Sequence, residues 1–412
     1  MSSLGTIVRS VIQQPGYPGV LAANFALGMA SSFVVPFLSM WGTLHIGMSP
    51  VMFGTFMTIT SVSAIVLSTL LARWSDTHVP RRTMLVVGSV CGMLGYAGYA
   101  FLTDVVALAV CGSLLVGTAT VNFSQLFAFM REELARPENK DADMPLLMSL
   151  LRVSFSLAWT VGPAIGAWVT VQWGYRGIFL GAVSLYAIFL LLTLRFVPHR
   201  SHPPVSRQHD GPSLLHVLAR WDIVSTFAAL VLVFAAFSMN MMNLPLLVTQ
   251  SLGGTKADVG WIFSIAPVFE VPLMVWFGQL AARGHQAGLI RAGIVAAGLY
   301  FAALILAQTP WQIYPMQILS AVSIAIMTNI TITFLQDMLP GHTGLATALY
   351  SNSFSGGSLI GFLGFGLLLE QIGYRGVFVI CVILCAAALG LLLIVRPQTP
   401  APAASSTSLR TP

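Results

Sequence analysis

The tetrapeptide Gly-Tyr-Arg-Gly stands at 174–177 and again at 373–376. Each copy is followed by an aliphatic residue and then Phe, and the same offset of 199 positions relates Ser-Phe-Ser at 154–156 to Ser-Phe-Ser at 353–355. A single offset for separate matches indicates that the chain consists of two related halves of about 200 residues each. Many membrane carriers are built from duplicated apolar halves that enclose a site between them.

The composition indicates that lipid covers most of the chain. Hydrophobic residues make up 56% of the 412 residues, whereas charged residues make up only 8%, and a soluble protein would carry about 25% charge. The net charge of +6 does not indicate nucleic-acid binding, because the arginines form no basic stripe. They lie in short gaps between apolar runs, which is typical of residues that set membrane topology.

Apolar runs and their breaks predict twelve membrane helices, since a helix needs about 20 apolar residues to cross a bilayer. The predicted spans are 18–44, 50–74, 83–102, 105–131, 146–170, 177–197, 222–249, 256–282, 287–306, 310–337, 341–369 and 373–396. We therefore expect an all-α membrane protein with twelve transmembrane helices in two pseudo-symmetric six-helix bundles.

Basic residues predict the orientation of these spans. Fifteen of the 19 Lys and Arg residues lie in gaps on the side of the two chain ends, and three lie on the other side (Arg176, Lys256 and Arg375), while Arg152 falls inside a span. This bias places both termini in the cytoplasm, so we expect a multi-pass protein of the cell inner membrane.

The domain organisation follows from the spans. We expect a cytoplasmic N-terminal tail at 1–17, a first bundle at 18–197, a cytoplasmic linker at 198–221, a second bundle at 222–396 and a disordered tail at 397–412. The linker is rich in Pro, His and Arg, which favours a solvated loop over a metal site because no Cys or carboxylate cluster accompanies its histidines.

Motifs for catalysis, ATP binding or metal binding are not evident. The stretch Gly-Gly-Thr-Lys at 253–256 lacks the spacing of a phosphate-binding loop. Cys381 and Cys385 share one helix face, but no other Cys or His lies on that helix, so a zinc site is not expected. We expect no enzyme activity, no cofactor and no bound metal.

Polar groups at membrane depth are the strongest candidates for a functional site, because a charge at the bilayer centre costs about 3 kcal/mol on insertion scales. Glu270 lies about 14 residues into its span, between Pro267 and Pro272, and Arg152 lies about six residues into another. The alternative to a functional role is a structural hydrogen bond for Glu270 and, for Arg152, a side chain that reaches the cytoplasmic interface. The residues expected to bind substrate are Arg152, Trp159, Asn240, Asn243, Glu270, Asn352 and Gln125.

The chemistry of this set suits a polyhydroxylated neutral ligand. Amides and carboxylates bond pairs of hydroxyl groups, and an indole covers the apolar face of a sugar ring. A single Asn can equally serve a helix–helix hydrogen bond. A lipophilic drug would require more aromatic residues and fewer amides.

A carboxyl group at membrane depth can carry a proton, because low dielectric favours its neutral form. We expect Glu270 to be the proton carrier, and Asp337, nearer the cytoplasmic interface, is the alternative. Arg152 could promote release of the proton if it approached either acid.

Several motifs in chain order resemble one known family. An acid and a basic pair between the second and third predicted spans resemble the loop of the major facilitator superfamily, although four residues separate the acid from the pair. The closer matches are Gln125-Leu-Phe-Ala with Arg131-Glu132, Arg152 with Ser156-Leu-Ala-Trp159 and Gly162-Pro163, Glu270-Val-Pro272, and Gln336-Asp337-Met-Leu-Pro-Gly341. Together they resemble the bacterial sugar efflux transporter family over nearly the whole chain.

The resemblance implies the major facilitator fold and proton-driven export of sugars such as lactose, glucose and glucosides. It implies a sugar, protons and the lipid bilayer as partners, no nucleic acid, a monomeric protein, and gate residues at Asp76, Arg81, Arg82 and Arg131. The gap after the eighth span is less basic than the family pattern, with only Arg283, His285 and Arg291, which leaves the cytoplasmic gate and the substrate range in question. A multidrug or other metabolite exporter, and a non-transporting sensor or scaffold, remain alternatives.

Overall fold

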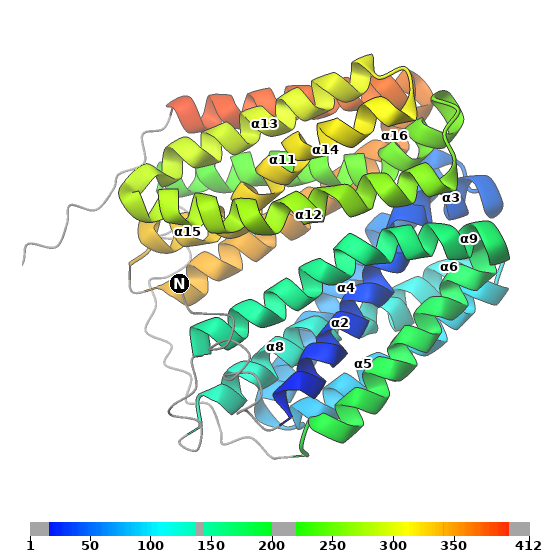
Figure 1. Cartoon of the computed structure of the whole chain (residues 1–412), viewed down its shortest axis with the longest axis vertical. Helices are drawn as coiled ribbons and strands as arrows, with labels where there is room; N and C mark the ends of the chain where they lie inside the picture. Colours follow the sequence, from blue (N-terminus) through cyan, green and yellow to red (C-terminus); the bar gives the residue numbers. More distant parts are fainter. Residues whose placement is uncertain (1–15, 137–143, 200–219, 341, 395–412) are drawn as a thin grey trace, which may run out of the picture.

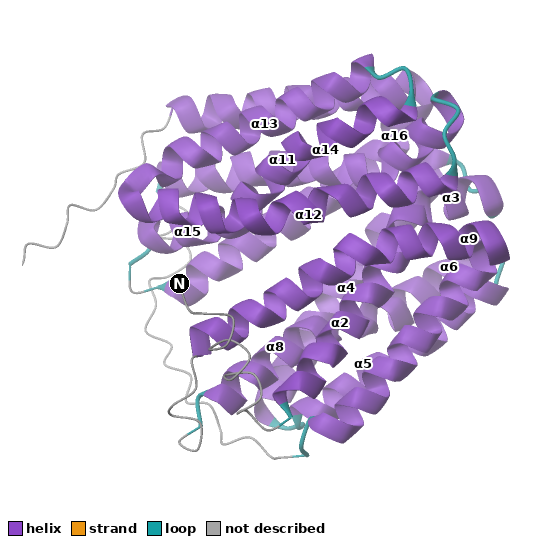
Figure 2. Ribbon diagram, in the orientation of Figure 1, coloured by secondary structure: helices purple, strands orange, loops and turns teal. Residues whose placement is uncertain are grey.

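The computed structural model describes residues 16–136, 144–199, 220–340 and 342–394, and every regular element in these ranges is helical (Figure 2). Nine of the described helices are long and apolar enough to cross a membrane. Three of the nine contain 51, 51 and 52 residues, about twice the length that one crossing needs, and each is broken at a glycine with positive φ. The helices are therefore consistent with the twelve predicted crossings.

Two helices of the first half begin at residues whose side chains cap the helix N-terminus. The Ser49 side chain accepts a hydrogen bond from the Met52 N–H, and Asp104 accepts one from Ala107, as expected for N-cap residues. The elements are α2 (Tyr17–Val34), η1 (Val35–Phe37), α3 (Leu38–Met40), η2 (Trp41–His45), α4 (Pro50–Thr77), α5 (Arg81–Phe101), α6 (Val105–Cys111), η3 (Gly112–Val116), α7 (Gly117–Ala119), α8 (Val121–Leu134) and α9 (Met144–Phe196).

The second half repeats this plan. Thr255 and Asp258 form a reciprocal capping box at the start of α12, which satisfies two backbone N–H groups. The elements are α11 (Trp221–Leu246), η5 (Leu247–Ser251), α12 (Lys256–Leu280), η6 (Ala281–His285), α13 (Gln286–Leu306), α14 (Pro310–Ala325), η7 (Ile326–Ile330), α15 (Thr331–Met338) and α16 (Thr343–Ile394).

The repeated tetrapeptide marks equivalent bends in the two halves. Gly174 breaks α9 and Gly373 breaks α16, and both have φ of 67° with an extended ψ of −165° and 177°. A side chain at either position would meet no atom within 4 Å. Glycine is therefore needed for the backbone conformation, which is nearly exclusive to glycine, and not for lack of space.

The bends define two ends of the molecule. We call the end at which Gly174 and Gly373 lie the far end, and the end at which α2 begins and α16 finishes the terminal end. Arg81 and Arg82 lie in the first turn of α5 and Arg131 in the last turn of α8. The helices thus extend a few residues beyond the predicted span edges. The arginines can lie within the helix ends because their long side chains reach the membrane interface.

Equivalent pairs of helices pack within each half. The Asn24 side chain of α2 donates to the Leu151 carbonyl of α9 at 2.7 Å, and the Asn243 side chain of α11 donates to the Tyr374 carbonyl of α16 at 2.8 Å. Such side-chain bonds satisfy polar groups that lipid could not. They hold α2 on α9 and α11 on α16.

Two equivalent contacts join the halves. A Cβ on Gly54 of α4 would lie 2.8 Å from the Cα of Gly366 in α16, and a Cβ on Gly260 of α12 would lie 2.7 Å from the Pro163 carbonyl oxygen in α9. Small residues allow this close approach of helices. Figure 1 shows α9 and α12 near each other beside α3, at the far end, and separating toward the terminal end.

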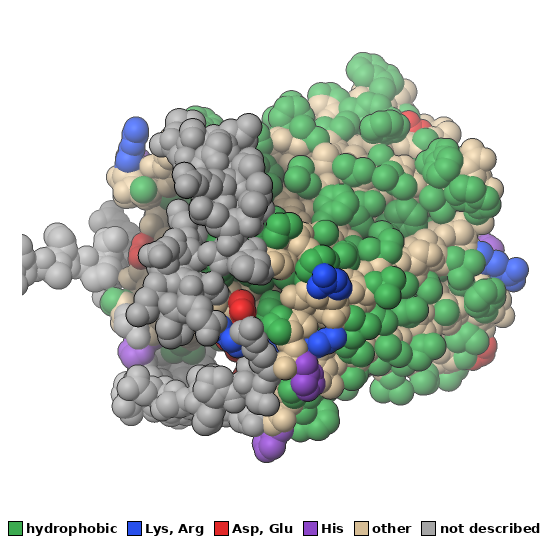
Figure 3. Space-filling model, turned by 60° about the horizontal axis from the view of Figure 1, so that its bottom comes forward, with side chains coloured by type: hydrophobic (Ala, Val, Ile, Leu, Met, Phe, Trp, Pro, Cys, Tyr) green, Lys and Arg blue, Asp and Glu red, His purple; other side chains and the backbone are tan. Residues whose placement is uncertain are grey.

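The outer surface is apolar, as lipid contact requires. Large exposed hydrophobic side chains include Val106, Leu191, Leu306 and Trp311. Hydrophobic side chains cover most of the described part of the face shown in Figure 3, and only a few charged side chains interrupt them. The tails predicted at 1–17 and 397–412 and the linker predicted at 198–221 fall largely outside the described residues, so the domain boundaries stay a prediction.

Candidate functional site

A cavity of about 290 Å³ lies within the first half. Residues from α2, α4, α5, α8 and α9 contribute to its wall, together with the short turns between them. Its lining is Leu27, Ser31, Val35, Leu38, Phe56, Met57, Thr60, Tyr96, Tyr99, Val116, Ala119, Thr120, Phe123, Phe155 and Tyr186. The volume is near the lower limit for small-molecule sites, and the wall contains no charged side chain and no amide.

Three tyrosines form the inner wall of this cavity. Tyr96 lies 6.1 Å from Tyr99 and 5.7 Å from Tyr186 between ring centroids, and all three rings are buried. Trp41 packs behind Tyr99 at 5.0 Å. These distances are typical of edge and offset aromatic contacts, so the inner wall is a connected aromatic cluster.

The mouth of the cavity lies between the halves. Thr120 and Phe123 are exposed, and the Phe123 ring is 5.0 Å from the Phe155 ring. The turn η1, which supplies Val35 to the wall, also contacts α11 and α12 of the second half. A ligand in the cavity would therefore be within reach of the second half.

Arg152, Phe155 and Trp159 lie along one face of α9, because their spacing of three and four residues is that of successive helical turns. Arg152 is exposed and Trp159 is half-buried. Arg152 makes no hydrogen bond or ion pair within the described part of the chain. Phe155 lines the cavity, so the two residues predicted from sequence flank its mouth.

Glu270 lies on the protein-facing side of α12. Val268 and Val275 are more than half exposed and mark the lipid side, whereas Glu270 shares the opposite face with Pro267 and with buried Phe277. The Glu270 carboxyl has no ion pair or hydrogen bond within the described ranges. It is therefore a half-buried carboxyl group with no partner of opposite charge among the described residues.

Register places Glu270 at the depth of Trp159. The Ala164 N–H of α9 donates to the Ser264 Oγ of α12 at 3.1 Å, and the two helices run antiparallel. Glu270 follows Ser264 by six residues along α12, and Trp159 precedes Ala164 by five residues along α9. Both side chains therefore lie about the same distance from this hydrogen bond, toward the terminal end. A ligand between them could contact both.

The three predicted asparagines occupy different environments. Asn243 is fully buried, and its side-chain Nδ2 donates a hydrogen bond to the Tyr374 carbonyl. Asn240 is also buried, and its Oδ1 has no hydrogen-bond partner. Asn352 is exposed on α16. The bond to the Tyr374 carbonyl favours a structural role for Asn243, although the side-chain oxygens of Asn243 and Asn240 can both still accept a hydrogen bond.

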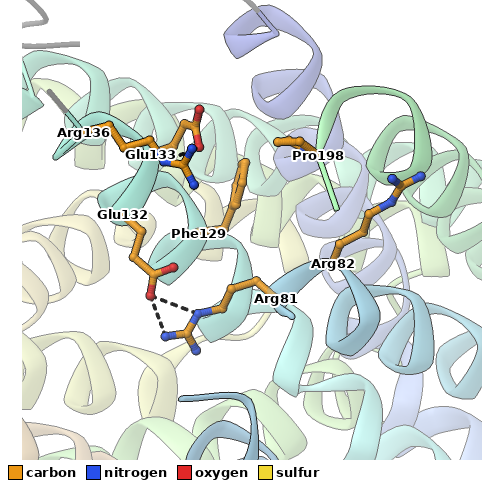
Figure 4. Close-up of a pocket in the computed structure, with 7 residues that line it drawn as sticks. All are labelled: Arg81, Arg82, Phe129, Glu132, Glu133, Arg136 and Pro198. Atoms are coloured by element: carbon orange, nitrogen blue, oxygen red, sulfur yellow. Dashed lines mark hydrogen bonds and ion pairs between the residues drawn. The ribbon is translucent and has the colours of Figure 1, made fainter. Parts of the chain in front are cut away.

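Two of the predicted gate residues, Asp76 and Arg81, form a charged cluster with Glu132 at the terminal end of the first half. The Arg81 Nη2 lies 2.7 Å from both Asp76 Oδ1 and Glu132 Oε1, and Arg81 is only 8% exposed. Figure 4 shows the Arg81 side chain of α5 directed at Glu132 of α8. A cavity of about 20 Å³ lies beside it, which is too small for a sugar, and the ion pairs join the ends of α4, α5 and α8.

Gln125 belongs to this cluster as well. Its Oε1 accepts hydrogen bonds from Arg81 at 3.0 Å and from the Ser75 hydroxyl at 3.0 Å. Gln125 is 1% exposed and does not line the cavity described above. The structure thus groups Gln125 with the predicted gate and not with Trp159 or Glu270.

Two other predicted gate residues lie nearby without joining the ion pairs. Arg82 points away from Glu132 in Figure 4 and donates to the Leu194 carbonyl at 2.8 Å. Arg131 is exposed at the end of α8. In the second half, the exposed Asp337 accepts a hydrogen bond from Gln286 at 2.8 Å, and it has no arginine partner among the described residues.

The far end contains a contact between the halves that sequence reasoning missed. The Lys256 Nζ lies 4.5 Å from the centroid of the Tyr175 ring, and the His45 ring lies 5.1 Å from the same ring. Tyr175 belongs to the first copy of the repeat, which was a usable signal. Tyr96 and Tyr99 carry neither a charge nor an amide, so the sequence does not distinguish them from other residues of an apolar span.

Metal binding is not supported within the ranges that the structure describes, because no group of three or more His, Cys, Asp or Glu side chains could hold an ion there.

Comparison with known proteins agrees with this architecture. The Major Facilitator Superfamily model matches twice, at residues 20–246 and 226–411. A Deinococcus radiodurans protein described among the sugar efflux transporters is 32% identical over 91% of this chain and 96% of its own length. Sugar efflux transporter A of Escherichia coli is 25% identical over 90% of this chain and 94% of its own length.

Solved structures share the fold at lower identity. The nucleoside transporter NupG superposes with a TM-score of 0.76 at 14% identity, over 92% of this chain and 98% of that chain. The peptide transporter POT in complex with sulfate gives 0.76 at 12% identity, over 94% and 96%. At these identities the likeness concerns the fold alone.

Proposed function

The chain belongs to the sugar efflux transporters of the major facilitator superfamily, and from this premise we propose that it exports sugars or glycosides across the cell inner membrane in exchange for protons. The observation that carries the proposal is the placement of Trp159 and the unpaired Glu270 at one depth, beside the mouth of a cavity and on opposite halves. An indole face and a carboxylate are suited to a sugar ring and its hydroxyl groups.

The contacts between halves support alternating access. Glycine pairs and the Lys256–Tyr175 contact hold the far end closed, while α9 and α12 separate toward the terminal end. Rocking of the two halves about a central site would close the terminal end and open the far end. With both termini in the cytoplasm, the present conformation would receive substrate from the cytoplasm.

The orientation can be tested by labelling. Cysteines introduced within 203–212, in the proposed cytoplasmic linker, should react with an impermeant maleimide only after the inner membrane is permeabilised. Labelling in intact spheroplasts would reverse the orientation and with it the direction of transport.

Proton coupling would follow from competition at Glu270. A carboxyl group without an ion-pair partner can exchange a proton when water reaches it from either side, and a sugar that bonds its carboxylate would oppose protonation. Asp337 is the alternative carrier, but it is exposed and bonded to Gln286. Its position at the terminal end suits a gate better than a carrier.

The proposal is tested with purified protein in liposomes. An imposed pH gradient should concentrate radiolabelled glucose, lactose or methyl β-glucoside, and unlabelled sugar should exchange with it when no gradient is present. Transport of a cationic dye with no sugar transport would favour the multidrug alternative. Absence of any binding or transport would favour a sensor or scaffold, although a scaffold has no use for a costly carboxyl group at membrane depth.

A variant of Trp159 tests the proposed ring contact. Trp159→Ala should weaken sugar binding by about 1–3 kcal/mol if a sugar ring packs on the indole. Isothermal titration of the detergent-purified variant measures this loss, and Trp168→Ala, which changes an exposed indole nearer the far end of the same helix, is the control. Equal affinities for Trp159→Ala and the unmodified protein would remove Trp159 from the site.

A further inference from the structure

The helices that carry the charged cluster of the first half have counterparts in the second half. Helices α5 and α13 each contain 21 residues, and an offset of 205 positions relates Gly88 to Gly293 and Asn122 to Met327. A Cβ on Gly88 would collide with the Asn122 side chain, and a Cβ on Gly293 would lie 2.9 Å from the Met327 side chain. The two glycines therefore make equivalent contacts, and the offset holds in the packing as well as in the sequence.

The same offset relates the Arg81–Glu132 ion pair to a pair that has lost its positive charge. Arg81 corresponds to Gln286, and Glu132 corresponds to Asp337. The Gln286 Nε2 donates to the Asp337 Oδ2 at 2.8 Å, whereas the Arg81 Nη2 lies 2.7 Å from the Glu132 Oε1. The contact between the helices is kept, but glutamine is neutral. The Asp337 carboxylate therefore has no cationic partner among the described residues of its own half.

Arg131, in the last turn of α8, is a cation without a partner. It is exposed and makes no hydrogen bond or ion pair within the described ranges. Its counterpart, Gln336, donates to the Thr347 hydroxyl of α16 at 3.3 Å. The offset of 199 positions between α9 and α16 places Met148 where the second half has Thr347, and a thioether is only a weak acceptor. The first half thus offers Arg131 no equivalent of the Thr347 hydroxyl.

Arg131 and Asp337 lie at the end of the molecule where the halves are apart. Arg131 continues the face of α8 that carries Phe123 and Phe127, because the three residues are spaced by four. Phe123 lies at the cavity mouth between the halves, and its ring is 4.7 Å from the Phe127 ring. Asp337 is exposed in the last turn of α15, and α8 and α15 lie toward the terminal end on opposite halves (Figure 1). Opposite charges are therefore presented by the two halves at the end that must close when the far end opens.

We propose that Arg131 and Asp337 form an ion pair between the halves when the terminal end closes, and that the neutral Gln286 leaves Asp337 available for it. We call this pair the terminal latch. The inference rests on the alternating access of the proposed function. It assigns different tasks to the two copies of one cluster, because the Arg81 copy joins helices within a half and the Asp337 copy joins one half to the other. A contact made in only one conformation shifts the balance toward that conformation, so the latch favours opening of the far end.

The test measures how often the far end opens. Thr249→Cys places a thiol at a half-buried position beside Met40 of the first half, and its rate of reaction with a hydrophilic maleimide reports far-end opening. The full-length protein is labelled in detergent without sugar, and protein that carries only its four native cysteines supplies the baseline. Arg131→Glu and Asp337→Arg should each slow the labelling about two- to fivefold, since each replaces an attraction by a repulsion.

Exchange of the two charges separates the latch from general damage. The double variant Arg131→Glu with Asp337→Arg should label within about twofold of the parent rate, because the pair forms again with its charges reversed. Loss of stability from two independent substitutions would add instead of cancelling, and thermal unfolding of each variant measures it. Arg283→Glu is the matched control, because Arg283 is an exposed arginine at the same end with no acidic partner in the described part of the chain. It should leave the labelling rate unchanged.

A variant of Gln286 tests why Asp337 is available. Gln286→Arg supplies the guanidinium that Arg81 supplies in the first half, so it should hold Asp337 within the second half and compete with Arg131. We expect labelling about two- to fivefold slower, as for the loss of the latch itself. Gln286→Met, which adds no charge, should label at the parent rate.

Each outcome decides the proposal. Unchanged labelling in both single variants, or a double variant slower than either single variant, would overturn the terminal latch and leave sugar export intact. Parent-rate labelling of Gln286→Arg would overturn the role given to Gln286. Rescue by charge exchange in a protein that transports no sugar in liposomes would overturn the proposed substrate and leave the latch, because neither sugar nor a proton gradient enters the labelling assay.

Discussion

The two halves share one plan, yet their terminal ends are held differently. In the first half, the buried guanidinium of Arg81 joins Asp76 of α4 and Glu132 of α8. At the corresponding junction of α12 and α13, the exposed Arg283 has no acidic partner in the described part of the chain, and Asp337 is bonded only to Gln286. The duplication preserved the helices and changed the interactions that join their ends.

The interiors of the two halves also differ. The first half encloses the aromatic cavity, and all of its described carboxylates lie at helix ends. The second half contributes Glu270 at membrane depth, and its buried Tyr300 is already bonded by Gln317 at 3.2 Å. The first half therefore encloses a cavity and has its terminal helix ends joined by ion pairs, whereas the second half carries the carboxyl group at membrane depth. Substitutions in each half can test this difference.

The largest effect is expected at Glu270. Glu270→Gln should abolish accumulation of sugar against its gradient and keep exchange of sugar at equilibrium, because the neutral amide resembles the protonated acid. Asp337→Asn should retain gradient-driven accumulation. Both are measured in liposomes with an imposed pH gradient. Normal uphill transport by Glu270→Gln would transfer the coupling role away from this residue.

The second effect concerns the charged cluster. Arg81→Ala removes the guanidinium that contacts Asp76, Glu132 and Gln125, and it should destabilise the protein by about 2–4 kcal/mol, somewhat less than for a fully buried pair because the carboxylates are partly exposed. Arg283→Ala should have almost no effect, as for most exposed positions. Thermal unfolding in detergent compares the two, and equal stabilities would show that the terminal ends are not joined differently.

The repeated bends should respond alike. Gly174→Ala and Gly373→Ala each force alanine into a backbone region that only glycine adopts readily, which costs about 1–3 kcal/mol. Both variants should lose similar stability in the same unfolding assay, since the dihedral angles match and neither site is crowded. A large difference between them would mean that the bends are not equivalent in function.

The smallest effect is expected at the far end. Lys256→Met removes the cation over Tyr175, a contact worth about 0.5–1 kcal/mol where partly exposed, and should shift the balance toward opening of the far end by roughly two- to fivefold. A cysteine at Thr249, half-buried beside Met40 of the first half, would then react faster with an impermeant reagent. Arg375→Met, in the other copy of the repeat, is the control and should leave the rate unchanged.

Sequence reasoning succeeded where local chemistry determines the result. Apolar runs predicted spans whose ends agree with the described helices to within a few residues and that are consistent with twelve crossings, because a bilayer demands a minimum apolar length wherever the helix stands. The offset between the two copies of Gly-Tyr-Arg-Gly indicated two related halves, and the structure shows that both copies lie at equivalent bends whose backbone requires glycine. Asp76 and Arg81 were both predicted as gate residues of one loop, and the structure joins them in an ion pair.

Prediction of the site was incomplete for a physical reason. Gln125 and Asn243 look like ligand contacts in a list of polar residues at membrane depth, but helix packing turns one toward Arg81 and the other toward the Tyr374 carbonyl. Tyr96 and Tyr186 look like ordinary apolar-span residues. They become a cavity wall only because α5 and α9 bring the rings to 5.7 Å.

By itself the sequence determined that the chain crosses a membrane in two related halves, and which residues are costly enough at depth to suggest a function. Composition, apolar length and positive-φ glycine act within a few residues of their own position, so they can be read along the chain. Only the tertiary structure decided which polar groups share a space, which are consumed by helix contacts and where a cavity remains. Those outcomes depend on the rotation and separation of helices that are far apart in sequence.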